Sequence, residues 1–487
     1  MPKLSTSSVL NSVLHCASAM ALLILTGLLS APFVSAQDFS VGSSSIQLKK
    51  YSPDMMEEIK KRKFPKRVLL DKVSGDAELA EVAKWNWVES LEIRSDSVSE
   101  LGQVAKLINL KKLRLGLKAS KENPTDLTPL AGLENLEELD LYANPVTKVE
   151  ALEGLTHLKV VKLYMARVSS IDFVAKAPDL EELNLYGYRH TFENYEPITK
   201  LKNLKKLNVY MNTQAVDEKL AALKSLTSLE EIRLSNCKKI TTFDFIENCK
   251  SMKRIDASWC RGIVDYSALS ALPMLEQVTL TEGTFKNLDF LKGKEKLKQV
   301  TLSRTPIANV NELSGLPSLE SLYLDGTEVT DITGLGNSPA LSFLSISKTK
   351  VSDISPLQSA DKLYGLRAVE TLISDLSPLA GKQGLTNLYL GKTPVTDLSP
   401  LKDLPKLRYL DLTGTAVSDI SVVGTLGSLA TLSLGSTKVT DFSVLHDGLP
   451  RLRSVTLPAS ISEDQLAALK EKRPKVRFTV EKVKTKK

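Results

Sequence analysis

Residues that could perform catalytic chemistry are few in this 487-residue sequence and lie far apart. The four histidines are His15, His157, His190 and His446, a spacing that predicts neither a metal site nor a catalytic triad. Residues 391–393 resemble the end of a phosphate-binding loop, but the glycine required five residues earlier is Thr386. We therefore predict no catalytic residue, no cofactor, no bound metal and no enzymatic activity.

Four tyrosines recur at a nearly constant interval and form the sharpest functional pattern. They are Tyr142, Tyr164, Tyr186 and Tyr210, and the residues two positions before them are Asp140, Lys162, Asn184 and Asn208. Tyrosine combines an apolar ring with a hydroxyl group, as binding hot spots often do. The longer segment after Leu185 adds Tyr188 and Arg189, followed by Tyr195. We predict that the first ten of these residues bind a partner.

Two alternatives to protein binding stay open for these tyrosines. Stacked aromatic rings on neighbouring strands also stabilise a sheet by packing on each other, without any ligand. Aromatic rows stack on sugars as well, so a carbohydrate ligand is a second alternative. A thinner aromatic set follows later in the chain at Tyr323, Phe343, Tyr389 and Tyr409.

A row of aspartates also recurs, and it invites a calcium hypothesis. Its members are Asp331, Asp353, Asp375, Asp397, Asp419 and Asp441. Each precedes an apolar residue and a Ser-Pro or similar turn, where a carboxylate can accept the free N–H groups of the turn. We expect this structural role and no metal.

Three cysteines lie beyond the first 36 residues. Cys237 and Cys260 fall on adjacent repeats with Cys249 between them. A disulfide between Cys237 and Cys260 and a pair of stacked free thiols are both compatible with this spacing.

These residues are positioned by a repeat of 22 residues. The first residue of each L-x-L triplet from Val300 to Leu432 recurs at that interval, and less regular triplets extend back to Leu91 and forward to Val455 and Val476. Alternating leucines predict short strands with one buried face, and one repeat cannot bury that face alone. Stacked repeats with parallel strands are therefore expected.

The repeat residues resemble a known family. One unit reads Leu385, Leu388, Leu390, Thr393, Val395, Asp397, Ser399, Pro400 and Leu401. This pattern resembles leucine-rich repeat proteins, closest to the internalin-like bacterial subclass with 22-residue repeats. The resemblance implies an α/β-type solenoid, a curved leucine-rich repeat array of about 19 rungs with a parallel sheet on the concave face and capped ends. It also implies that the threonines equivalent to Thr393 bond backbone groups at the bend.

The ends of the chain differ from the array between them. Residues 1–36 have the features of a secretory signal peptide: Lys3, an apolar run to Leu29, and small residues before Gln37. A retained signal anchor is the alternative, although the run is shorter than a bilayer requires. Residues 37–48 are Ser-rich and predict a disordered linker, 49–90 an N-terminal cap with a degenerate first rung, 91–457 the array, and 458–487 a C-terminal helical cap and basic tail.

The charge distribution and the expected export limit the classes of function that this protein can have. The formal charge is +7, but the two ends are basic and the array between them is acidic, which argues against a nucleic-acid partner. We expect a secreted or periplasmic bacterial scaffold, with no transmembrane segment in the mature chain, that binds a protein partner on its concave face as a monomer. The alternative is a non-catalytic envelope or structural component, held by its basic ends to an anionic polymer or membrane surface.

Overall fold

The computed structural model describes residues 39–482 except 53, 73, 118–124, 143, 145, 147–148, 188–193 and 213–214. The expected signal peptide and the end of the basic tail lie outside the described residues. The chain divides into two compact units, one of residues 1–110 and 116–118 and one of residues 111–115 and 119–487. In the part of the chain that the structure describes, every helix is too short or too polar to cross a membrane.

The first unit contains short strands and helices in alternation. Its elements are β1 (Phe39–Val41), β2 (Ser45–Leu48), α2 (Met55–Lys61), β3 (Arg67–Leu70), α3 (Asp76–Val82), β4 (Ser90–Ile93) and the 3-10 helix η1 (Val104–Lys106). β1 pairs with β2 antiparallel, and β2, β3 and β4 pair in parallel. The helix α2 lies within the expected N-terminal cap and buries Met55 and Ile59.

The expected disordered linker at residues 37–48 is wrong, because residues 39–41 form β1 and residues 45–48 form β2. Ile46 and Leu48 are fully buried, and Ile46 pairs with Val68, which lies one 22-residue interval later. The alternation of Ile46 and Leu48 is thus one more repeat strand. Ser45 in this strand is half-buried and Ser43 and Ser44 before it are exposed, a composition that made the segment resemble a linker.

The second unit contains the strands β5 to β21, and each pairs in parallel with the next. Their bounds are β5 Lys112–Leu115, β6 Glu138–Asp140, β7 Val160–Lys162, β8 Glu182–Asn184, β9 Lys206–Asn208, β10 Glu231–Arg233, β11 Arg254–Asp256, β12 Gln277–Thr279, β13 Gln299–Thr301, β14 Ser321–Tyr323, β15 Phe343–Ser345, β16 Gly365–Arg367, β17 Asn387–Tyr389, β18 Tyr409–Asp411, β19 Thr431–Ser433, β20 Ser454–Leu457 and β21 Arg477–Val480. The expected rungs correspond to β3–β21.

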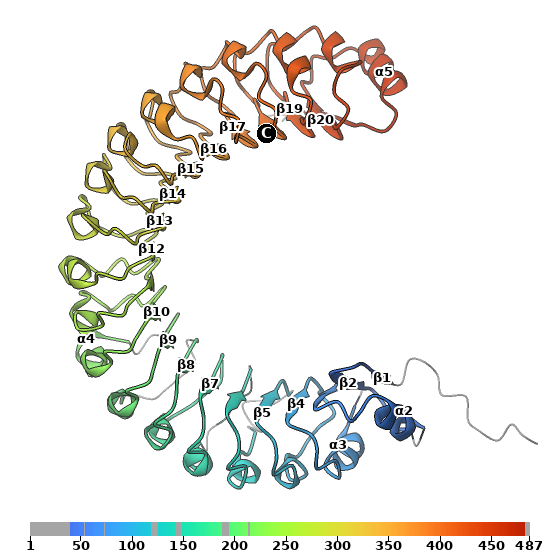
Figure 1. The fold of residues 1–487 in the computed structure, drawn as a ribbon, viewed down its shortest axis with the longest axis vertical. Coiled ribbons are helices and arrows are strands. Elements are labelled where there is room, and N and C mark those ends of the chain that lie inside the picture. Colours follow the sequence, from blue (N-terminus) through green and yellow to red (C-terminus); the bar gives the residue numbers. More distant parts are fainter. Residues whose placement is uncertain are drawn as a thin grey trace, which may run out of the picture. The chain divides into compact units, whose positions relative to one another are not determined.

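Short helices return the chain from one strand of the second unit to the next. They are η2 Thr128–Leu130, η3 Glu150–Gly154, η4 Asp172–Lys176, η5 Glu196–Lys200, α4 Asp217–Leu220, η6 Ala221–Ser225, η7 Asp244–Ile246, η8 Ser267–Ala271, η9 Asp289–Leu291, η10 Asn311–Leu313, η11 Thr333–Leu335, η12 Ser355–Ser359, η13 Ser377–Leu379, η14 Ser399–Leu401, η15 Ser421–Thr425, η16 Ser443–Leu445 and α5 Glu463–Lys472. Within this unit the strands line the inner side of an arc and the short helices its outer side (Figure 1). The unit is therefore a curved leucine-rich repeat solenoid with its parallel sheet on the concave face.

The core of the second unit lies between the strands and the returning segments. The central residue of each strand from β6 to β19 is buried, as in Leu183, Leu322 and Leu388, which are all 0% exposed. The same residues face each other in register, for example Leu366 with Leu388. Stability thus comes from contact between successive rungs, as expected for a solenoid.

The threonines equivalent to Thr393 close the bends of the regular repeats, as the family resemblance implied. In the regular repeats the buried threonine Oγ1 donates to the carbonyl oxygen three residues earlier, as Thr393 does to Leu390 at 2.6 Å. Cysteine fills the same position in two earlier repeats, where Cys237 Sγ donates to Val209 O at 3.1 Å. One bend geometry therefore serves side chains of different chemistry.

The C-terminal cap is formed by α5 and β21. Ser462 and Gln465 make a capping box at the start of α5, since Gln465 N donates to Ser462 Oγ at 3.1 Å and Ser462 N donates to Gln465 Oε1 at 3.2 Å. The last strand was expected at Val476, but Phe478 is the residue opposite Val455. Val476 is buried in the turn that leads from the helix, which explains why its apolar side chain suggested the wrong register.

Candidate partner-binding surface

The four tyrosines of the second unit form one continuous stack, which we call the tyrosine column (Tyr142, Tyr164, Tyr186 and Tyr210). Each lies two residues beyond the end of its strand, from β6 to β9. Successive ring centroids are 4.7, 4.4 and 4.8 Å apart, with ring planes inclined by 2°, 19° and 16°. Parallel strands place the rings about 4.8 Å apart, a spacing that matches the distance at which aromatic rings stack.

The stacked rings cover each other's faces and leave other parts of the column open. Tyr142 at the first end is 44% exposed, and the other three rings are half-buried. The Tyr186 hydroxyl donates to Met211 Sδ at 3.7 Å. Burial, and then a hydrogen bond to Tyr186, raises the pKa of the Tyr164 hydroxyl above its usual value. The column therefore presents ring edges and hydroxyl groups.

Two of the predicted polar neighbours hold the tyrosine backbone in place. Asn184 Oδ1 accepts a hydrogen bond from the Tyr186 N–H at 3.0 Å, and Asn208 Oδ1 accepts one from the Tyr210 N–H at 2.9 Å. These two hydrogen bonds fix the backbone turns that carry the Tyr186 and Tyr210 side chains. A shallow cavity of about 190 Å³ lies beside these amides, lined also by Glu182, Lys206, Glu231 and Arg233.

The two charged neighbours form ion pairs with the sheet. Arg114 lies 3.4 Å from Asp140, and its guanidinium is 5.5 Å from the Tyr142 ring centroid. Burial raises the pKa of Asp140 above its usual range even though Arg114 opposes the shift. Lys162 lies between two carboxylates, 3.4 Å from Glu138 and 3.8 Å from Glu182. The polar side chains beside the column are thus already partnered within the unit.

Alternating acidic residues and lysines lie beside the tyrosine column, and the sequence analysis does not predict them. It occupies the position just before each strand, and we call these pairs the charge ladder: Lys159–Glu137 at 3.0 Å, Lys205–Glu181 at 3.1 Å, Lys253–Glu230 at 2.9 Å and Lys298–Glu276 at 3.1 Å. Aligning the repeats by their leucines would have shown the alternating signs in one column. The early sheet face is therefore internally neutralised.

The insertion after Leu185 is only partly described by the structure. Tyr188 and Arg189 lie outside the described residues. Tyr195 is 2% exposed and belongs to the core, where burial raises the pKa of its hydroxyl. It directly precedes the returning helix η5 and lies in the apolar interior, outside the set of ten residues expected to bind a partner.

The recurring aspartates from Asp331 to Asp441, which we call the aspartate column, cap the returning turns. Asp353, Asp397 and Asp441 each accept a hydrogen bond through Oδ1 from the N–H two residues later, at 2.7 to 2.8 Å. These bonds, together with the serine hydroxyl, lower the pKa of Asp397 below its usual value. Among the described residues no group of three or more His, Cys, Asp or Glu side chains is arranged to hold a metal ion.

The cysteines are free thiols in the interior. Cys237, Cys249 and Cys260 are buried and unbridged. Burial raises the pKa of the Cys249 and Cys260 thiols to about 12, so both stay protonated at neutral pH. Cys260 Sγ donates to Leu234 O at 3.0 Å, one repeat beyond the equivalent bond of Cys237. The stacked-thiol alternative holds in this structure.

Known proteins share this architecture. The family model described as leucine-rich repeats in two copies matches residues 383–424. The fold is similar to an internalin, InlF, of Listeria monocytogenes, with 21% identity, a TM-score of 0.53 and coverage of 70% of this chain and 89% of that one. It is also similar to a leucine-rich repeat protein of Leptospira interrogans, with 17% identity, a TM-score of 0.58 and coverage of 84% and 93%.

A third similar structure is a complex from Drosophila. The Toll–Spätzle complex aligns at 14% identity with a TM-score of 0.62, covering 87% of this chain and 62% of that one. The search of curated proteins gave no match. The chain is a leucine-rich repeat protein. Its fold is of the internalin-like kind, with a 22-residue repeat in its regular part.

Proposed function

We propose that this protein is a non-catalytic, secreted or periplasmic scaffold that recognises a protein partner on the concave face of its second unit. The binding surface comprises the tyrosine column with Asp140, Lys162, Asn184, Asn208, Tyr188 and Arg189. The observation that carries the proposal is the column itself: four stacked, partly exposed tyrosines on consecutive rungs. Export is supported by the signal-like composition of residues 1–36.

The position of the column favours recognition over packing alone. The rings stand beyond the strand ends, where exposed side chains border the sheet, and their backbone turns are fixed by Asn184 and Asn208. A surface ordered before binding loses little conformational entropy when a partner docks. The surrounding charges are paired, so affinity comes from the aromatic rings and hydroxyl groups and depends little on salt. The Toll–Spätzle structure supports the proposal by showing a similar fold in complex with another protein.

The test is partner capture from native envelope extract and culture medium with the chain from Gln37 onward. Tyr164→Ala/Tyr186→Ala removes the centre of the column, and Tyr323→Ala/Tyr389→Ala is the matched control on other strands of the same sheet. We expect the first variant to lose a protein that the second retains. Retention by both, or equal loss from both, contradicts the proposal.

Packing and recognition are separated by a second pair of substitutions. Tyr164→Phe/Tyr186→Phe keeps the stacked rings and removes the hydroxyl groups, so the melting temperature should stay near that of the unmodified chain. Weaker capture at an unchanged melting temperature supports recognition through the hydroxyls. If a captured ligand is a polysaccharide and no protein is retained, the carbohydrate alternative is correct instead.

The alternative role as an envelope component held by basic ends makes a different prediction. Attachment through Lys and Arg side chains to an anionic surface is screened by salt over a distance of about 10 Å at 0.1 M ionic strength. Release of the protein from envelope preparations by moderate salt favours that role. Retention of a captured protein partner at the same salt concentration favours the tyrosine column.

A further inference from the structure

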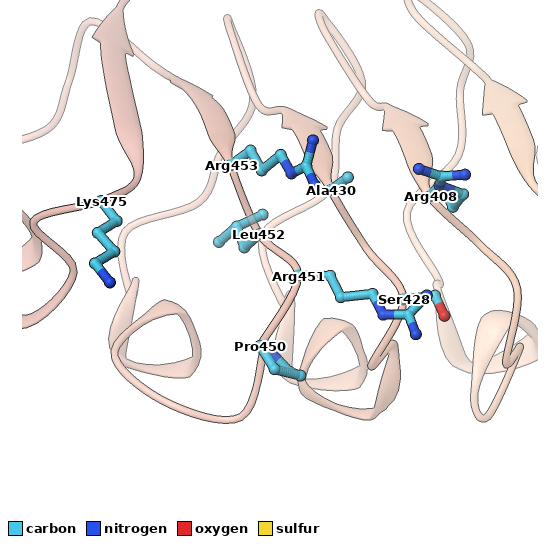
Figure 2. A pocket seen from close by; sticks show the side chains of 8 residues that line it. All are labelled: Arg408, Ser428, Ala430, Pro450, Arg451, Leu452, Arg453 and Lys475. Atoms are coloured by element: carbon cyan, nitrogen blue, oxygen red, sulfur yellow. The ribbon is translucent and has the colours of Figure 1, made fainter.

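A hollow lined by cations lies near the C-terminal end of the second unit. It has a volume of about 600 Å³ and is lined by Arg408, Ser428, Ala430, Pro450, Arg451, Leu452, Arg453 and Lys475. Figure 2 shows Ala430 between Arg453 and Arg408, and the Arg451 side chain extending toward Ser428. We call this feature the arginine hollow.

The spacing of the repeats builds the hollow. Arg408, Ala430 and Arg453 directly precede β18, β19 and β20, and their backbones are joined, since Arg453 N donates to Ala430 O and Ala430 N donates to Arg408 O, both at 2.9 Å. The two arginines are therefore two strands apart, about 10 Å at the usual strand spacing. The small side chain of Ala430, 8% exposed, forms the floor between them.

The cations of the hollow are exposed and have no acidic partner. Among the described residues, no carboxylate oxygen lies within 4.0 Å of the charged groups of Arg408, Arg451, Arg453 or Lys475. The same position before the strand carries paired charges in earlier repeats, as in Lys253 with Glu230. The contrast matters because unpaired, neighbouring cations repel each other unless an anion lies between them.

The cationic surface is short and borders aromatic side chains. In the strand-preceding position the repeats before Arg408 carry the neutral residues Ser342, Tyr364 and Thr386. Tyr364 is 43% exposed and Tyr409, next to Arg408, is 40% exposed. A long uniform polyanion would meet cations over only a few strands. A short acidic stretch next to an apolar residue would contact both the cations and the aromatic rings.

We propose that the arginine hollow binds a short acidic segment of a protein partner, with glutamate or aspartate carboxylates at Arg408, Arg451 and Arg453 and a neighbouring apolar side chain against Tyr409. Guanidinium groups suit this ligand because they bind carboxylates in a bidentate manner. The site is separate from the tyrosine column and does not depend on the function proposed for it.

The test uses a fluorescein-labelled peptide of five glutamates followed by phenylalanine, and fluorescence anisotropy with the chain from Gln37 onward. Arg408→Ser/Arg453→Ser removes two cations of the hollow. Lys253→Ser/Lys298→Ser is the matched control, because it changes the net charge equally at the equivalent position but removes paired cations. We expect the arginine variant to weaken binding by about tenfold and the lysine variant by less than twofold.

Several results would overturn the proposal. One is equal weakening by both variants, which would show a response to net charge alone. Another is equal binding of a peptide with glutamines in place of the glutamates. Tighter binding of inorganic polyphosphate or heparin than of the acidic peptide, lost with the same arginines, would assign the hollow to a polymer instead. Melting curves of both variants confirm that the compared proteins are folded.

Discussion

The early and late parts of the second unit's sheet share one backbone plan but carry different outer side chains. From β6 to β13 the position before the strand carries the charge ladder, and the position beyond the first four of these strands carries the tyrosine column. From β15 to β17 the same position before the strand is neutral, and from β18 to β20 it carries Arg408, Ala430 and Arg453. The two parts share their buried residues and differ in their outer residues. The residues that build the scaffold are therefore distinct from those that form its surface.

The regularity of the bends follows the same division. Threonine occupies the bend position from Thr305 to Thr437, whereas Asn144, Asn212, Cys237 and Cys260 occupy it earlier. The early repeats are also the ones with insertions, after Leu113, Leu183 and Leu207. Insertions in a solenoid extend loops without disturbing the core, and such loops often serve a binding face.

The largest effect is expected from the shared core. Leu183→Ala in the early part and Leu388→Ala in the late part each remove a fully buried side chain. Each should lower the free energy of unfolding by about 2–5 kcal/mol. Urea unfolding followed by circular dichroism measures both. A loss below about 1 kcal/mol for only one of them would break the claim that both parts share one core.

A smaller effect is expected at the bend. Thr393→Val removes the 2.6 Å hydrogen bond to the Leu390 carbonyl, which keeps the 3.2 Å bond from the Thr393 N–H, so the cost should be about 0.5–1.5 kcal/mol. The exposed Thr396→Val is the control and should change stability little. Cys237→Ala in the early part should cost less than Thr393→Val, since a thiol is a weak donor. The opposite order would mean that the cysteine bends are the stronger ones.

The charge ladder should contribute less again. Lys253→Gln breaks a pair with Glu230 at 2.9 Å, while Lys402→Gln in the late part removes an exposed lysine that forms no ion pair with a described residue. The difference in unfolding free energy between these variants should be at most about 1 kcal/mol at low salt and should vanish near 1 M salt. Equal stability at low salt would show that the ladder does not stabilise the early part.

The smallest effect per residue is expected from the aspartate column. Hydrogen bonds from the turn lower the pKa of Asp375, Asp397 and Asp419 in the folded state. A lowered folded pKa means that this stabilisation is present above the unfolded pKa near 3.8 and is lost as the pH falls through the folded pKa. Replacing the three residues with Asn should therefore flatten acid unfolding below that pH. An unchanged acid midpoint would contradict this role.

Much of the fold follows from the sequence because the repeat is regular. Leu366, Leu388 and Leu410 define strands, register and core at once, since a constant interval leaves one stacking arrangement. The tyrosine column follows from the same interval. The structure adds that its rings stack at 4.4–4.8 Å.

The features that the sequence did not predict lie where the repeat is irregular, or where residues that meet in the fold are far apart in the chain. The strand at Ile46 stands alone among serines, and the helix before Phe478 shifts the register of the last strand. Tyr195 lies in an insertion, where the interval no longer indicates which residues face inward. Arg408 and Arg453 are 45 residues apart, and only their position on neighbouring rungs brings them to one hollow.

The most direct test of the separation between scaffold and binding surface is amide hydrogen exchange of the second unit, with and without the captured protein partner. We expect slower exchange at the turns that carry Tyr186 and Tyr210, whose N–H groups donate to Asn184 and Asn208, and unchanged exchange from β15 to β17. Protection confined to β15–β17, with the tyrosine turns unaffected, would contradict it.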